Sequence, residues 1–141
     1  MNAVHAVAGS SAALDVAAAA VTGQGLFAAT GPMSHLRAAA SLFPEPVHIV
    51  VRADSDIDSL KDLAGRRVAL GSPASGSRHT AMRLLSNAGV DPGSVVMPYS
   101  GEPAGALARL AAGELDAVIE VASAPWQQLQ EAARRTPLRL V

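Results

Sequence analysis

The sequence predicts an α/β domain with a mainly parallel sheet. After residue 46, apolar runs of roughly four to six residues alternate with helix-periodic runs of about ten. Several of the helical runs stop at a glycine, the residue that most often follows a helix C-terminus. Strands and helices that alternate in this way are typical of βαβ units. With 141 residues, half of them apolar, the chain can form one compact core.

The first 46 residues are predicted to be helix and loop. An alanine-rich helix ends at Val21 and begins at Ser10 or at the serine after it, a residue type suited to an N-cap. A glycine-punctuated loop follows. Two extended segments, LRAAASLF and VHIVVRA, then flank the link Pro44–Pro46. We therefore predict a boundary at this link, between an N-terminal segment (residues 1–46) and a β/α lobe (residues 47–141).

The lobe is predicted to follow a regular order of strands and helices. In chain order we expect a strand at 47–53, a short helix before Gly65, a strand at 67–70, a helix at 77–87, a strand at 95–97, a helix at 103–112, a strand at 116–121, a helix at 125–134 and a strand at 138–141. No helix follows the last strand, and an uncovered apolar edge strand is prone to aggregate. On this ground we expect the chain to be cut short.

Composition and charge exclude several classes of function. Lys and Arg number 11 against 12 Asp and Glu, so we expect no basic surface for nucleic acid or an anionic membrane. Aromatic residues make up 3% and cysteine is absent, which argues against stacking platforms, disulfides and thiolate metal sites. The N-terminus lacks a basic start, and glycines and Pro32 break the uncharged run Val16–Ser34. We therefore expect neither a signal peptide nor a membrane span.

The stretch GSPASGSRHTAMRLL, which begins at Gly71, is the main candidate for a binding site. Its small residues connect a strand to a helix, so backbone N–H groups and the positive end of the helix face a carboxylate or phosphate. The hydroxyls of Ser72, Ser75 and Ser77 could donate hydrogen bonds to such a ligand. Alternatively, Ser75 or Ser77 only caps its helix. The stretch lacks the Lys of a Walker loop and the GxGxxG pattern.

A second loop of small residues precedes the last predicted helix. Ser123 and Ala124 come before Pro125, which is suited to the first position of a helix. In open α/β sheets, ligands bind beyond the carboxyl ends of the strands, so the two loops are expected to face one cleft.

Other polar residues give weaker signals. The four histidines lack metal-ligand spacing and no GxSxG motif is present, so we expect no metal, no cofactor and no enzyme activity. His48, between apolar neighbours, is predicted to be a half-exposed strand residue, and Glu114 and Asp116 are predicted to lie at the surface. One short segment is rich in charge, and we prefer a solvated helix entry to a calcium site for its members Asp54, Asp56, Asp58, Lys61 and Asp62.

Three segments together resemble a known family. They are an aromatic-Pro-Glu-Pro segment with a Val-rich strand (Phe43–Arg52), a strand-loop-helix (Leu63–Ser77), and a second strand-loop-helix (Gly113–Pro125). In this order and spacing they resemble the TAXI family of substrate-binding proteins of TRAP transporters, a branch of the type II periplasmic-binding-protein fold. The resemblance covers nearly all of this chain and the middle of a family member. It implies one three-layer αβα lobe and an incomplete second lobe.

The resemblance also implies a function. A family member captures a small organic anion, such as an amino acid or a carboxylate, between two lobes that close on a hinge, and delivers it to TRAP membrane permease subunits in the periplasm. The implied ligand-binding residues are Ser72, Ser75, Gly76, Ser77, Ser123, Pro125 and, from the other lobe, Ser10.

The chain departs from the family pattern at several of these positions. Ala74 and Ser123 stand where Gly is usual, Ser77 stands where Thr is usual, and Gly9–Ser11 replace a Gln-Ser-Asp triplet. The last change is expected to weaken ligand contacts. The structural alternative is therefore a truncated lobe that binds nothing tightly and forms a homodimer through its exposed hinge edge. An enzyme on the same fold is a third reading, but no base or nucleophile in the sequence supports it.

Overall fold

A computed structural model describes residues 18, 20–33, 44–73, 75–97 and 101–141 of the chain. Its contacts divide the chain into two units, Met1–Glu45 and Pro46–Val141. The division falls inside the Pro-Glu-Pro link. The larger unit contains the sheet and the helices around it.

The described part of the first unit contains the end of a helix and a single 3-10 turn. Ala18 and residues 20–22 are helical, one residue beyond the predicted end, and the Thr22 hydroxyl donates to the Ala18 carbonyl at 2.8 Å. Gly23 then turns the chain at φ +67°, where a Cβ would lie 2.5 Å from the Pro32 nitrogen. The 3-10 turn η1 spans Gly25–Phe27. The predicted helix start and the segment LRAAASLF lie outside the described residues.

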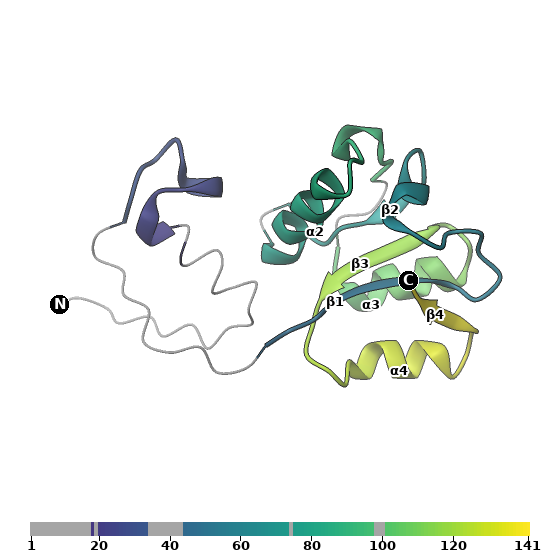
Figure 1. Ribbon diagram of the computed structural model, residues 1–141. Helices are drawn as coiled ribbons and strands as arrows, with labels where there is room; N and C mark the ends of the chain where they lie inside the picture. Colours follow the sequence, from purple (N-terminus) through teal and green to yellow (C-terminus); the bar gives the residue numbers. More distant parts are fainter. Residues whose placement is uncertain (1–17, 19, 34–43, 74, 98–100) are drawn as a thin grey trace. The chain divides into compact units, whose positions relative to one another are not determined.

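The second unit is built on a four-stranded sheet with the order β2-β3-β1-β4 (Figure 1). The strands are β1 (Val47–Arg52), β2 (Val68–Ala69), β3 (Ala117–Val121) and β4 (Leu138–Leu140). β2 is parallel to β3, whereas β1 is antiparallel to both β3 and β4. Three strands thus share one direction and β1 runs against them. β1 enters the sheet before the first full helix, so no βαβ crossover fixes its direction.

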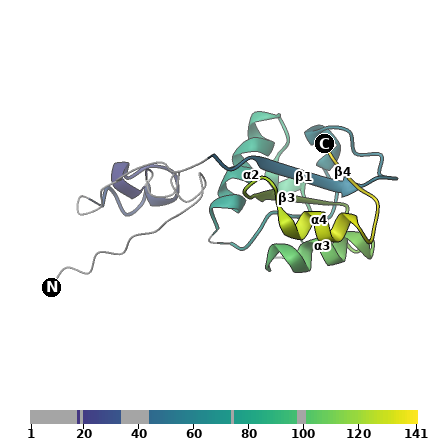
Figure 2. The same cartoon turned by 90° about the horizontal axis from the view of Figure 1, so that it is seen from below.

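Helices cover both faces of this sheet, which confirms the predicted three-layer αβα arrangement. Successive strand residues point to opposite faces. Val51 and Ile119 pack toward α2 (Gly76–Asn87), and Val50 and Val118 pack toward the opposite layer. That layer consists of α3 (Pro103–Ala111) and α4 (Gln127–Ala133), which lie side by side in Figure 2.

Two of the expected helices differ from the prediction. The short helix before Gly65 is the 3-10 turn η2 (Leu60–Leu63), which Ser59 and Asp62 close with reciprocal capping hydrogen bonds. The last helix, α4, begins at Gln127 with Trp126 as its N-cap. Pro125 therefore does not occupy the first helical position. The Trp126 side chain is only 6% exposed, and its burial against the sheet fixes where the helix can begin.

Two expected strands are short. The predicted strand at 67–70 is β2, with only Val68–Ala69 in strand conformation. The predicted strand at 95–97 forms one isolated parallel bridge, Arg67 to Val96, beside β2. The 3-10 turn η3 (Pro92–Ser94) precedes it, and Asp91 caps this turn by accepting from the Gly93 N–H at 2.9 Å.

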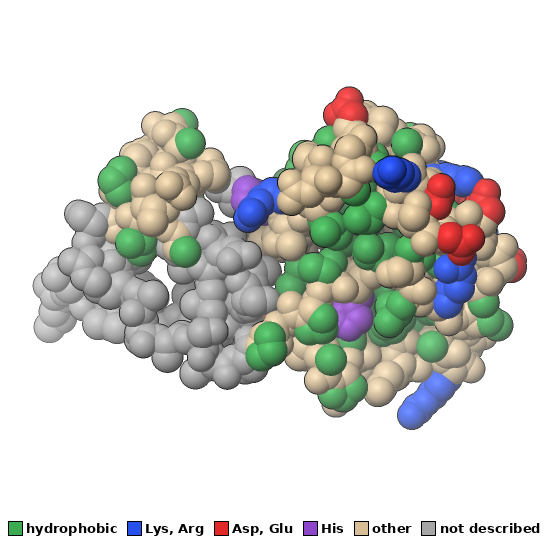
Figure 3. All heavy atoms as spheres, in the orientation of Figure 1, with side chains coloured by type: hydrophobic (Ala, Val, Ile, Leu, Met, Phe, Trp, Pro, Cys, Tyr) green, Lys and Arg blue, Asp and Glu red, His purple; other side chains and the backbone are tan. Residues whose placement is uncertain are grey.

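Ion pairs tie the loops at one end of the second unit together. Figure 3 shows acidic and basic side chains intermingled there. Asp116 accepts from the Arg67 backbone N–H at 2.8 Å and from the Arg67 guanidinium at 3.0 and 2.6 Å. The Asp116 side chain is 19% exposed, so it is partly buried, and its hydrogen bonds link the start of β3 to the start of β2. The prediction that Asp116 is simply a surface residue is therefore wrong.

Candidate functional site

The loop between β2 and α2 is held by its own hydrogen bonds. Ser75 is the N-cap of α2, and its Oγ accepts from the Arg78 backbone N–H at 3.1 Å. The Ser75 hydroxyl also donates to the Ser72 carbonyl at 2.9 Å. Gly71 begins the loop at φ +82°, a conformation that favours glycine. The capping role, one of the two alternatives for Ser75, is therefore what the structure shows.

A buried carboxylate lies next to this loop. Glu120 is on β3 and is only 8% exposed. The Ser77 hydroxyl donates to Glu120 Oε1, and the Val121 N–H donates to Ser77 Oγ at 3.4 Å. Ser77 is itself 8% exposed, so its hydroxyl lies in the interior of the lobe.

Strand register explains why Glu120 reaches the start of α2. β2 and β3 are parallel, with Ala69 opposite Val118, so Gly71 comes level with Glu120 two residues further on. A Cβ on Gly71 would lie 3.6 Å from Glu120 Oε2 and 2.8 Å from Ser75 Oγ. The missing side chain of Gly71 thus leaves room for the Ser75 hydroxyl, and the Glu120 carboxylate lies at an ordinary contact distance from the same position.

His48 is the neighbour of Glu120 on the other side. The β1–β3 register pairs the two residues directly, so their side chains share one face of the sheet. His48 is 8% exposed, and its ring centroid lies 5.3 Å from that of Trp126 at an interplanar angle of 58°. The predicted half-exposed position of His48 is wrong. Within the described residues, its buried Nδ1 has no hydrogen-bond partner.

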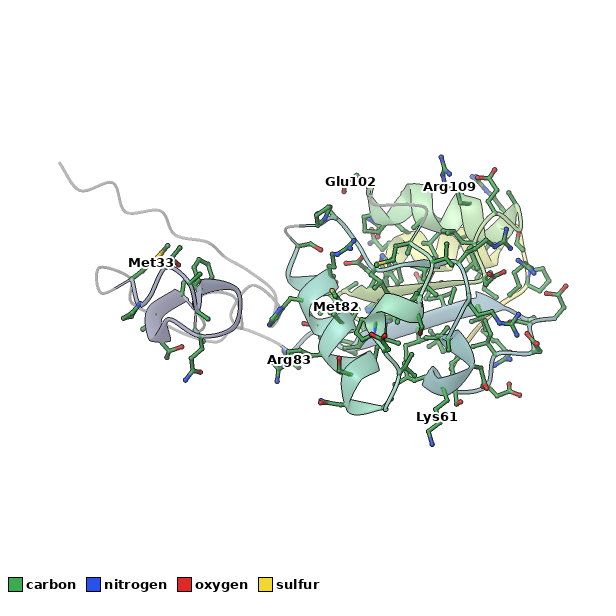
Figure 4. All side chains as sticks on the ribbon, turned by 90° about the horizontal axis from the view of Figure 1, so that it is seen from above. Met33, Lys61, Met82, Arg83, Glu102 and Arg109 are labelled. Atoms are coloured by element: carbon green, nitrogen blue, oxygen red, sulfur yellow. The ribbon has the colours of Figure 1, made fainter. Side chains whose placement is uncertain are left out.

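A cavity of about 200 Å³ lies between the loop and the start of α3. Its lining residues come from the β2–α2 loop, the start of α3 and the carboxyl end of β3. They are Gly71, Ser72, Ser75, Gly101, Glu102, Pro103 and Glu120. Figure 4 shows Glu102 at the beginning of α3. Glu102 is the N-cap of that helix and makes no side-chain capping hydrogen bond, and Pro103 is the first helical residue. The N-termini of α2 and α3 and the carboxyl ends of β2 and β3 therefore converge on one cavity.

The structure gathers part of the predicted site. Ser72 and Ser75 line the cavity, and Gly76 and Ser77 follow them as the first two residues of α2. Ser123 and Pro125 are exposed and are not among the residues that line it. Ser10 lies outside the described residues.

The sequence analysis missed Glu120 as a site residue. The segment AVIEV was interpreted only as a strand, and every residue of this strand is buried. A charged residue is rarely buried unless it is paired, so a single Glu within an apolar strand was the signal that could have identified the site.

The acidic segment after β1 is used for ion pairs with arginine. Asp54 pairs with Arg52 at 3.3 Å, Asp56 with Arg66 at 2.7 Å, and Asp58 with Arg139 at 2.7 Å. Asp62 accepts from Ser59 instead, and this bonding lowers the pKa of the Asp62 carboxyl. Over the part of the chain that the structure describes, no three His, Cys, Asp or Glu side chains are grouped to hold a metal ion.

The chain matches a known protein family. The model of the NMT1-like family matches residues 5–141. The chain belongs to the NMT1-like family. The narrower TAXI branch, which the motifs resemble, stays a prediction.

Three solved structures are similar to the lobe. The periplasmic aliphatic sulphonate binding protein SsuA from Escherichia coli is 27% identical, with a TM-score of 0.56 over 68% of this chain and 33% of that chain. The alkanesulfonate-binding protein SsuA from Xanthomonas axonopodis pv. citri, bound to MOPS, is 28% identical, with a TM-score of 0.54 over 67% of this chain and 30% of that chain. PhnD1 from Prochlorococcus marinus, in complex with methylphosphonate, is 22% identical, with a TM-score of 0.50 over 67% of this chain and 39% of that chain, and shows the fold alone.

These likenesses show that the chain has the periplasmic-binding-protein fold. The chain spans about a third of the length of the solved structures that it matches. By their descriptions, the two SsuA proteins are sulfonate-binding proteins. Among the helices of the described residues, none has the length and apolar character needed to cross a membrane.

Proposed function

We propose that residues 46–141 form a ligand-binding lobe that captures a small organic solute with an anionic group, an amino acid or a carboxylate first of all. The observation that carries this proposal is the cavity of about 200 Å³ onto which two helix N-termini converge. The first N–H groups of each helix have no acceptor within the helix and form a ready site for an anion. The position beyond the carboxyl ends of parallel strands is also where ligands bind in open α/β sheets.

The α3 N-terminus is the better of the two positions for the anionic group. α2 already has its N-cap, Ser75, and the Ser77 hydroxyl is directed to Glu120. The N-cap residue of α3, Glu102, makes no side-chain capping hydrogen bond, so we assign the ligand's anionic group to the first turn of α3. The cavity is smaller than the roughly 300–1,000 Å³ of pockets for drug-sized ligands, which favours a small solute.

The wider assignment rests on family likeness. We infer that the solute is captured in the periplasm and passed to a membrane permease, with a TRAP-type permease as the first candidate because of the resemblance to TAXI proteins. The sulfonate-binding relatives add alkanesulfonates to the ligands worth testing. Ser123, Pro125 and Ser10 are proposed to contact the ligand from outside this cavity.

Isothermal calorimetry on the full 141-residue chain tests the proposal. The titrants are amino acids, dicarboxylates and alkanesulfonates at concentrations up to the millimolar range. We expect saturable binding that S72W abolishes, because Ser72 lines the cavity and an indole there fills it. S86W is the matched control, since Ser86 is exposed on α2 outside the cavity lining. Absence of heat with every titrant, or equal loss in both variants, would contradict the proposal.

A second candidate is a lobe that associates with itself through the β4 edge of the sheet. It is favoured by the exposure of large apolar side chains there, 57% for Leu140 and 36% for Val141. Light scattering after size exclusion separates the candidates. A dimer that L140K converts to a monomer, in a protein without ligand binding, supports self-association.

A further inference from the structure

We propose that the groove between α3 and α4 is the interface of a weak twofold homodimer, in which each copy packs its α4 against the groove of the other. This surface is separate from the solute cavity and from the β4 edge, so the proposal does not depend on the proposed function. It follows from the incomplete burial of α4, from the apolar lining of the groove and from two opposite charges beside it.

α4 is the least buried of the α-helices described in the second unit. None of its residues is buried, whereas α2 and α3 bury three residues each. α4 packs mainly on α3 (Figure 2), and Leu129 and Ala132 reach the core only in part. A helix of seven residues is marginal in water, because most helical stability in proteins comes from packing of an apolar face. A further surface packed against α4 would therefore stabilise it.

The groove beside α4 can receive a helix. It has a volume of about 200 Å³ and its apolar lining consists of Leu107, Ala104, Ala108, Ala111 and Ala132. Leu107 is 2% exposed and belongs to the core of the lobe. The other apolar side chains are small, so another helix can approach to the distance of about 8 to 10 Å that packed helices keep.

Two opposite charges on the α4 side of the groove indicate which helix binds there. Glu131 and Arg135 line the groove and are exposed, and within the described residues neither takes part in an ion pair. Under a twofold axis, α4 of one copy runs antiparallel to α4 of the other. Arg135 of each copy then lies beside Glu131 of the other. The surface is thus complementary to itself in charge, which selects a second copy of this chain as the occupant.

The dimer is expected to be weak. Contacts built on two short helices fall at the low end of interface sizes, about 1,200 Å² or less, where association is transient. Exposed ion pairs contribute little and are screened by salt. We therefore expect association in the micromolar to millimolar range that weakens as the salt concentration rises.

Sedimentation velocity on the full 141-residue chain, over a range of protein concentrations, tests the proposal with two charge reversals. E131R and R135E each place like charges in both symmetric contacts, so each is expected to raise the dissociation constant of the dimer about tenfold or more. R134E is the matched control. Arg134 is exposed at the same end of α4 but does not line the groove, so this variant should keep the dimer.

A mixture of E131R and R135E in equal amounts gives the stricter test. In a mixed dimer, both symmetric contacts again join opposite charges, so the mixture should regain the dimer that each variant alone has lost. A folding defect in either variant cannot produce this recovery. Both residues are exposed, and urea unfolding of each variant is expected to match that of the unaltered chain.

Three results would overturn the proposal. They are a chain that stays monomeric up to millimolar concentration, a dimer that both charge reversals leave intact, and a mixture that fails to regain the dimer. A dimer that L140K disrupts and the charge reversals do not belongs to the β4 edge and is a case of the second result. None of these results bears on solute binding, which calorimetry tests separately.

Discussion

Replacing Gly71 by alanine tests the geometry of the β2–α2 loop. Gly71 has φ +82°, and an alanine in this region loses about 1 to 2 kcal/mol relative to glycine. Its Cβ would also lie 2.8 Å from Ser75 Oγ, too close for the capping hydroxyl to stay in place. Loss of a serine N-cap costs about 1 kcal/mol. We therefore expect G71A to lower the free energy of unfolding by about 2 to 3 kcal/mol.

Gly89 provides the matched control. It has a similar φ of +77°, but nothing lies within 4 Å of a Cβ at this position. G89A should therefore lose only the backbone contribution of about 1 to 2 kcal/mol. Urea unfolding followed by the fluorescence of Trp126 measures both variants. This is the one tryptophan of the chain, and it is 6% exposed in the larger unit, so its signal reports the unfolding of the lobe.

Introducing G71A into the S75A variant isolates the contribution of the contact between the new Cβ and Ser75 Oγ. With S75A the Oγ is absent, and the next contacts of a Cβ at position 71 are ordinary ones at 3.5 and 3.6 Å. G71A should then cost only the backbone contribution, so the double variant loses about 1 kcal/mol less than the sum of the single variants. Equal losses for G71A and G89A together with strict additivity of G71A and S75A would refute the described loop geometry.

Three further predictions concern the lobe. D116N should lower the free energy of unfolding by about 1 to 2 kcal/mol at pH 7, because Arg67 donates three hydrogen bonds to the carboxylate. These bonds hold the pKa of Asp116 below its usual range, so this stability is present above about pH 4 and is lost as the pH falls through the folded-state pKa. Urea midpoints of the two proteins measured at several pH values should therefore converge in acid, and a constant difference would contradict the pairing. L110A should cost about 2 to 5 kcal/mol because Leu110 is 0% exposed, whereas L140A at 57% exposure should cost far less, and similar urea midpoints would contradict the assigned core. S77A should cost about 1 to 3 kcal/mol by removing the hydroxyl that donates to buried Glu120, and S77T, which keeps a hydroxyl, should recover part of this loss in thermal unfolding.

Local signals in the sequence predicted most of the fold. The boundaries of α2 and α3 agree with the prediction within one residue, because Ser75, Pro103 and Gly113 are capping residues that act within one turn of the helix. The three-layer arrangement followed from the alternation of strands and helices.

Features that depend on contacts between distant segments were not predicted. β1 lies between β3 and β4 and is covered on both faces, so His48 is buried although its neighbours in sequence predicted a half-exposed strand. The start of α4 is set by the burial of Trp126, which Pro125 as a local signal did not reveal. The contact of Glu120 with Ser77 joins residues 43 positions apart and depends on strand register, which the sequence does not specify.

The most direct test of the central claim is a two-dimensional ¹⁵N–¹H NMR titration of the full chain with the tightest ligand from the calorimetric panel. A ligand in the cavity should shift the amide signals of residues 71–77 and of the first turn of α3 in a saturable way, with the signal of Glu120 among them. The β4 edge and the turn before β3 should stay unchanged. Saturable shifts confined to residues outside the cavity lining, or no shifts at millimolar ligand, would contradict the assignment of this lobe as a solute-binding wall.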